Sequence, residues 1–240
     1  MDVLNCNHVT KQVKGKILVQ DISFSIHKGD VVGLIGSNGA GKTTIFKLIL
    51  GLMKITKGSI HIQGFDIQKN FVKAMEKVGA IVENPDFYMY LSGEDNLKIT
   101  ANNYKNIPKD RINEVTKIVG LENRIKDKVS TYSLGMRQRL GIAQAILHRP
   151  DLLILDEPTN GLDIDGIIEI RELIKKLSQE GIAILLSSHN LTEIDNLCNR
   201  IIAIKNGRIV IDDTIEKFKT TSEDSIEDAF VKRMGENSID

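Results

Sequence analysis

Cysteine is scarce in this sequence of 240 residues, and its two cysteines, Cys6 and Cys198, are far apart and form no CxxC pair. A zinc site or a disulfide framework is therefore unsupported, and a reducing compartment is expected. No apolar run approaches the roughly 18 residues that a membrane helix needs, and the first residues lack the basic flank and apolar stretch of a signal peptide. We expect a chain that neither enters nor crosses a membrane by itself.

The sequence also has no excess charge of either sign, because 32 Lys and Arg balance 32 Asp and Glu. Proteins that bind nucleic acid usually offer a net basic face to the phosphate backbone, so nucleic acid is not expected as the main partner. The hydrophobic share of 41% is ordinary for a globular protein. The length allows one large domain, or a core into which a lobe is inserted.

Apolar segments alternate with helical patterns along most of the chain. Ile22, Phe24 and Ile26 alternate with polar residues, as in a half-buried antiparallel strand, whereas Val31–Ile35 is continuously apolar, as in a strand covered on both faces. Further segments follow, which we list in order: helix 43–52, a strand at Ile60 and Ile62, helix 134–147, strand 152–155, helix 165–179, strand 182–186 and strand 200–204. This alternation predicts an α/β fold with a mostly parallel sheet.

The stretch that begins at Asn84-Pro85-Asp86 has a different character. It is rich in Lys, Asn and Asp and contains helical patterns near 93–104 and 109–119. We interpret residues 84–142 as an inserted α-helical lobe, with the core formed by 1–82 and 143–213. Residues 214–240 are predicted to be a C-terminal tail that is helical in part.

A glycine-rich loop lies between the apolar strand and the first helix. Gly36-Ser37-Asn38-Gly39-Ala40-Gly41-Lys42-Thr43 matches the pattern G-x-x-x-x-G-K-[ST], and Thr44 follows it. The glycines let backbone N–H groups turn toward an anion, and the helix directs its positive end to the same place. Lys42 can reach the β and γ phosphates and Thr43 can ligate Mg²⁺. The sequence therefore predicts binding of a nucleoside triphosphate with Mg²⁺, and the alternative is a flexible turn.

Two further apolar strands end in candidate catalytic residues. Asp156 and Glu157 follow Leu152–Leu155, and His189 follows the strand that ends at Ser187. Beside a phosphate loop, Asp156 is placed to meet Mg²⁺ and Glu157 to polarise an attacking water. His189 can then meet the γ-phosphate. The alternative for each is a solvated polar residue at a strand end.

The order of these motifs, with Tyr132–Met136 and Gly161-Leu162-Asp163 between them, resembles the ATP-binding subunits of ATP-binding cassette (ABC) transporters over about residues 1–220. The resemblance implies an α/β fold with a P-loop NTPase core, an antiparallel β subdomain and an inserted helical lobe, and it implies hydrolysis of ATP. It also implies a head-to-tail homodimer in which Ser133 and Gly135 of one chain close the phosphate loop of the other. Asp163 would then lie at the dimer interface.

The same resemblance implies a separate transmembrane permease as partner and a place at the cytoplasmic face of the membrane. An ABC-type ATPase that acts on nucleic acid or ribosomes is the alternative, but such relatives usually carry two cassettes or a long coiled coil. A small nucleotide kinase or GTP-binding switch is a third reading, and it would lack the segment Tyr132–Met136.

Three departures from the usual family pattern involve four residues. Leu134 and Met136 replace a glycine and a glutamine around Gly135, and Val13 stands where the family stacks an aromatic ring on adenine. Glu83 replaces a glutamine at the root of the lobe, where we expect it to contribute to catalysis and to the metal site. This replacement, together with the ending Ser225–Phe230, resembles the branch that exports, or gives immunity to, bacitracin and lantibiotic peptides. A neutral exchange of Gln for Glu is the alternative.

Overall fold

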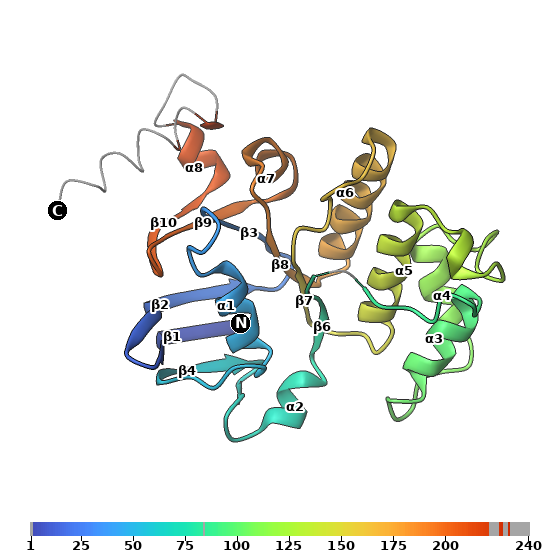
Figure 1. The fold of residues 1–240 in the computed structure, drawn as a ribbon, viewed down its shortest axis with the longest axis horizontal. Helices are drawn as coiled ribbons and strands as arrows, with labels where there is room; N and C mark the ends of the chain where they lie inside the picture. Colours follow the sequence, from blue (N-terminus) through green and yellow to red (C-terminus); the bar gives the residue numbers. More distant parts are fainter. Residues whose placement is uncertain (1, 84, 221–225, 228–229, 231–240) are drawn as a thin grey trace.

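The computed structural model describes residues 2–83, 85–220, 226, 227 and 230, and within them it shows an α/β core with a helical lobe at one end (Figure 1). The strands are β1 (Asp2–Val13), β2 (Lys16–His27), β3 (Val31–Ile35), β4 (Lys57–Ile62), β5 (Phe65–Asp66), β6 (Val78–Ile81), β7 (Leu152–Leu155), β8 (Ala183–Ser187), β9 (Arg200–Lys205) and β10 (Arg208–Thr214). The helices are α1 (Lys42–Ile49), α2 (Phe71–Met75), α3 (Gly93–Ala101), α4 (Arg111–Ile118), α5 (Leu134–Ile146), α6 (Ile164–Gln179), α7 (Leu191–Leu197) and α8 (Ile215–Thr220), and Val129–Thr131 forms a 3₁₀ turn.

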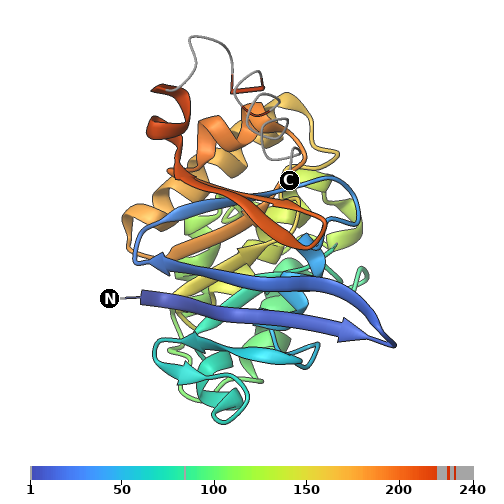
Figure 2. The same cartoon turned by 90° about the vertical axis from the view of Figure 1, so that its left-hand side faces the viewer.

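The strands form two sheets, as the sequence predicts. The larger sheet has the order β10-β9-β3-β8-β7-β6, in which only β10 pairs in the antiparallel sense. The smaller sheet, β2-β1-β4-β5, is antiparallel, and its two long strands β1 and β2 run side by side in Figure 2. The predicted mostly parallel sheet, antiparallel β subdomain and helical lobe are thus confirmed.

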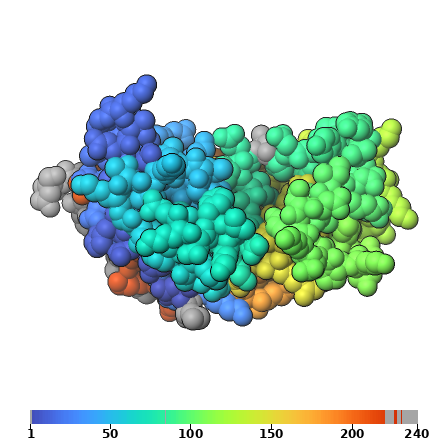
Figure 3. All heavy atoms as spheres, turned by 90° about the horizontal axis from the view of Figure 1, so that it is seen from below, coloured from blue at the N-terminus to red at the C-terminus, as the bar shows by residue number. Residues whose placement is uncertain are grey.

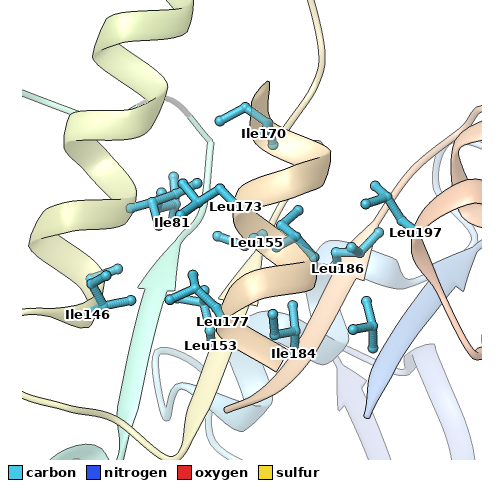
Figure 4. Close-up of a cluster of buried hydrophobic side chains, with 14 of the residues drawn as sticks. Ile81, Ile146, Leu153, Leu155, Ile170, Leu173, Leu177, Ile184, Leu186 and Leu197 are labelled. Atoms are coloured by element: carbon cyan, nitrogen blue, oxygen red, sulfur yellow. The ribbon is translucent and has the colours of Figure 1, made fainter. Parts of the chain in front are cut away.

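The larger sheet is buried on both faces, which explains its continuously apolar strands. Side chains alternate across a strand, so Leu153 and Leu155 of β7 pack toward α5 and α6, whereas Leu152 and Ile154 pack toward α1 and the smaller sheet. Figure 4 shows the first of these two clusters, where residues of α6 such as Leu173 lie over the strands. The two clusters fix the sheet between its neighbouring layers.

The lobe joins the core through α5, which continues without a break through residue 142, the predicted end of the lobe. The amide of Gln144 on α5 donates to the Thr100 hydroxyl over 2.9 Å, linking α5 to α3. The buried guanidinium of Arg111 on α4 caps the end of α5, since its Nε and Nη2 donate to the carbonyls of Leu147 (3.0 Å) and Ile146 (2.6 Å). Neither carbonyl has a partner within the helix, and the Ile146 carbonyl also accepts the Arg149 N–H over 3.1 Å.

The predicted tail from residue 214 begins as part of the packed structure. Ile215 and Phe218 of α8 are buried in the same hydrophobic cluster as side chains of α5, α6 and α7. The helix α8 meets the prediction of partial helix. Most of the later tail lies outside the described residues, and so do residues 225, 228 and 229 of the ending Ser225–Phe230. Helix length and hydropathy within the described ranges give no candidate membrane span.

Both cysteines are buried, and this burial raises the pKa of the Cys6 and Cys198 thiols far above the ordinary value. A thiol must lose its proton to act as a nucleophile or to ligate a metal. Cys6 and Cys198 are therefore small core residues in this fold.

Replacing Arg111 by Met is expected to destabilise the chain by about 2–4 kcal/mol, because two buried carbonyls lose charged donors. Urea unfolding measures this difference. The matched control is Lys117→Met, at an exposed position of the same helix, for which we expect a change within about 0.5 kcal/mol. A loss below about 1 kcal/mol for Arg111→Met would show that the cap is dispensable.

Candidate active site

The phosphate loop lies between β3 and α1 and forms a cradle for an anion. Gly39 (φ 81°) and Gly41 (φ 121°) adopt backbone conformations that side chains disfavour, and no side chain caps α1 at Gly41. The first N–H groups of α1 thus remain directed at the cradle. Lys42 is buried, and its Nζ donates to the Gly36 carbonyl over 2.6 Å.

A cavity of about 260 Å³ opens at this loop. Its lining combines the loop with the end of β7: Ser37, Asn38, Gly39, Gly41, Lys42, Thr43, Thr44, Asp156 and Glu157. Most of the predicted phosphate-binding residues therefore meet the two predicted carboxylates, as the motif spacing suggested. Gly36 and Ala40 do not line the cavity. The Gly36 carbonyl accepts the hydrogen bond from Lys42 Nζ, and the side chain of Ala40 is buried in the core.

The two carboxylates are held by the neighbouring strand. The strands β7 and β8 are parallel, so their carboxyl ends meet at one edge of the sheet. The Ser187 hydroxyl donates to Asp156 Oδ1 over 2.6 Å and accepts the Glu157 N–H over 2.9 Å. His189 Nδ1 lies 2.8 Å from Glu157 Oε2. Glu157 has a positive φ of 49°, a conformation that persists only where its surroundings hold it.

The donor set suits ATP with Mg²⁺. The hydroxyl of Thr43 and the carboxylate of Asp156 face the same cavity, and hard oxygen donors of this kind are those that Mg²⁺ prefers. Lys42 and the N–H groups at the start of α1 supply positive charge for the phosphates. These residues would hold the metal and the triphosphate together.

Ser133, Gly135 and Asp163 also lie together, but outside this cavity. Ser133 caps α5 by accepting the Met136 N–H over 3.2 Å, and Asp163 caps α6 by accepting the Gly166 N–H over 3.0 Å. Gly135 lies against Gly166, whose Cα would be 3.8 Å from a β-carbon at Gly135. The segment around Ser133 and the loop that ends at Asp163 therefore form one surface of the chain.

Two predicted site residues, Val13 and Glu83, are also not among those that line the cavity. Val13 ends β1 at the β1–β2 turn and is 41% exposed. Glu83 lies two residues beyond β6, with its carboxylate 74% exposed and 3.8 Å from Lys47 Nζ. The contact of Val13 with a base and the role of Glu83 at the metal stay predictions.

Sequence reasoning missed the residues that hold the site. Ser187 and Ser188 stand at the polar end of a strand, and nothing in the local sequence of Thr159 or Glu193 indicates a role in the site. Paired serines after an apolar strand gave a signal, but their partners are set by the strand order, which no local pattern shows.

Strand, loop and helix around this cavity define a phosphate-loop nucleotide-binding domain. Residues 19–160 match the family described as ABC transporter. The uncharacterized ABC transporter ATP-binding protein YhcH of Bacillus subtilis (strain 168) is 51% identical over 209 residues, which cover 87% of this chain and 68% of that protein. The bacitracin transport ATP-binding protein BcrA of Bacillus licheniformis is 44% identical over 209 residues, covering 87% and 68%.

A solved ATP-binding subunit of an ABC transporter superposes with a TM-score of 0.86 at 28% identity, and the match covers 97% of this chain and 99% of that one. The chain belongs to the ABC transporter family, as an ATP-binding subunit. The predicted resemblance, including that to the bacitracin branch, is confirmed. None of the relatives named above favours the alternative of an ATPase acting on nucleic acid.

Replacing Glu157 by Gln is expected to leave ATP binding within about threefold and to lower the hydrolysis rate by roughly 10²–10⁴-fold, because an amide cannot accept the proton of the attacking water. Binding of a fluorescent ATP analogue and release of phosphate measure the two quantities. The control is Glu180→Gln, an exposed glutamate at the end of α6. Near-normal phosphate release by Glu157→Gln would remove the residue from its proposed role as base.

Proposed function

We propose that this chain hydrolyses ATP to drive export of peptide antibiotics through a separate membrane permease. The observation that carries the proposal is a hydrogen-bonded group beside the phosphate cavity. Ser187 binds Asp156 and the Glu157 N–H, and His189 contacts the Glu157 carboxylate. The substrate class rests on the similarity to the bacitracin transport protein and on Glu83. The chain would act at the cytoplasmic face of the membrane through its permease.

The proposal assigns a task to the residues at the cavity and to His189 beside it. Glu157 accepts a proton from the attacking water, and His189 holds the Glu157 carboxylate in place and faces the γ-phosphate. Lys42 and the loop N–H groups hold the phosphates. Mg²⁺, held by Thr43 and Asp156, supplies positive charge to the phosphate oxygens when bound.

Two copies of the chain would form the complete site. Ser133 and Gly135 begin α5, whose positive N-terminal end lies away from the cavity of its own chain. In a head-to-tail homodimer that end closes the phosphate loop of the partner, with Asp163 at the interface. The exposed apolar side chains of Leu134 and Ile164 lie beside these residues and would be covered there.

A groove of about 940 Å³ between α2 and the lobe offers a place for the permease. Figure 3 views this face, with the teal segment that holds α2 on one side and the green lobe on the other. Apolar side chains of Phe71, Val72 and Ile107 line the groove. Its charged lining is mixed, because Glu76 is present and Lys77 and Arg149 are paired with Asp151 and Glu114. An apolar segment fits this lining.

Tyr104 of the lobe and His148 of the core stack in this groove, with ring centroids 4.3 Å apart. His148 lies 3.0 Å from the Val78 carbonyl through Nε2, and burial lowers the pKa of its imidazole. The ring is therefore neutral at physiological pH. The stack connects the lobe with the core at the surface where the permease is proposed to bind.

The test of the proposal is capture of the membrane partner by tagged chains extracted from native membranes. Val72→Asp is expected to lower the yield of co-purified permease at least about tenfold, because the carboxylate would be buried against apolar surface. The matched control is Ile17→Asp, an exposed apolar side chain on the β1–β2 hairpin, which should keep the wild-type yield. Equal capture by both variants, or no membrane protein with the wild type, would contradict the proposal.

Glu83 is proposed to act in coupling. We expect Glu83→Gln to leave ATP binding nearly intact, since Lys42 and the loop amides carry it, and to lower antibiotic resistance more than the ATPase rate of the isolated chain. Lys47→Met, which removes the neighbouring cation of Glu83, tests whether the ion pair is involved. Parallel falls in both quantities would make Glu83 a metal ligand only, and no change in either would make it a neutral exchange.

A further inference from the structure

A buried carboxylate lies behind the active site, on the first turn of α7. Glu193 is 7% exposed, and its oxygen Oε2 accepts two hydroxyl groups. The Thr159 hydroxyl donates to it in a short hydrogen bond, and the Ser188 hydroxyl donates over 3.2 Å. Burying a charge is costly unless such donors are present, so this arrangement is specific.

The two donors come from the two loops that carry the chemistry. Thr159 follows Glu157 by two residues, in the loop that continues to Asp163, and Ser188 directly precedes His189. The loops are thus joined at two points. Ser187 joins them beside the cavity, through Asp156 and the Glu157 N–H, and Glu193 joins them on the buried side.

The bonds around Glu193 also fix the backbone beneath His189. The single proton of the Ser188 hydroxyl lies within reach of the Glu193 carboxylate at 3.2 Å and of the Asn190 carbonyl at 3.4 Å, and the hydroxyl oxygen accepts the Asn190 N–H over 3.0 Å. The Asn190 side chain in turn accepts the Glu193 N–H over 3.3 Å as the cap of α7. Residues 188, 190 and 193 therefore form a closed ring of hydrogen bonds that spans His189.

We propose that Glu193 is a positioning residue for ATP hydrolysis. Its carboxylate holds the loop of Glu157 against the loop of His189 and so sets the 2.8 Å contact between them. The positive φ of Glu157 needs such support from its surroundings. This inference rests on the proposed ATPase function and assigns Glu193 no contact with nucleotide.

The experiment compares ATP binding and steady-state hydrolysis for the purified full chain, five variants and one control variant. Glu193→Ala is expected to lower kcat roughly 10- to 100-fold with KM within about threefold, because the phosphate loop stays intact. Glu193→Gln should keep kcat within about threefold, since one amide oxygen can accept both hydroxyls. Thr159→Val should lower kcat like Glu193→Ala, and Thr159→Ser should restore it.

The kcat of the double variant Thr159→Val with Glu193→Ala is expected to lie within about threefold of the kcat of Glu193→Ala, because both changes break the same connection. The matched control is Glu172→Ala, an exposed helical glutamate of α6, which should keep the wild-type kcat. If Glu193→Ala does not fold, Thr159→Val and its Ser counterpart decide the question.

Wild-type kcat in folded Glu193→Ala or in Thr159→Val would overturn the inference while leaving the proposed function in place. So would equal loss of binding and turnover, or a Gln variant as slow as the Ala variant. A wild-type chain that binds ATP without hydrolysing it would overturn the proposed function itself, and the inference with it.

Discussion

Parallel pairing of β7 with β8, and of β8 with β3, places the carboxyl ends of these strands at one edge of the larger sheet. The phosphate loop, the carboxylates of Asp156 and Glu157, and His189 follow those ends directly. Segments far apart in the sequence therefore meet at this edge of the sheet. Both faces of the sheet are covered by packed layers, and close packing of this kind holds the strands in place.

Hydroxyl groups transfer that rigidity to the reactive groups. Ser187 binds both Asp156 and the backbone of Glu157, so the two carboxylates keep fixed positions relative to β8. A short hydroxyl side chain has little rotational freedom to lose, and it loses that freedom in the folded state before nucleotide binds. A site arranged in advance in this way spends less of its binding energy on ordering.

The sequence predicted what local patterns determine. The phosphate loop, the acidic end of β7 and the lobe each depend on residues close in the chain, and the structure contains them with small shifts at the ends of elements. Strand order is a non-local property, so the partner of Ser187 and the buried position of Glu193 could not be read from the sequence. The cap of α5 by Arg111 was missed for the same reason, because donor and acceptors come from different helices.

The helix α5 links the two regions on which the proposed function depends. Its first turn, at Ser133 and Gly135, lies against the start of α6, and Arg139 binds Glu169 of α6 over 3.0 Å. Its far end is capped by Arg111 and continues into Leu147 and His148, which line the groove. Its 13 residues span roughly 20 Å as one rigid body. The helix thus connects the Asp163 loop with the groove proposed for the permease through packed side chains rather than through a loop.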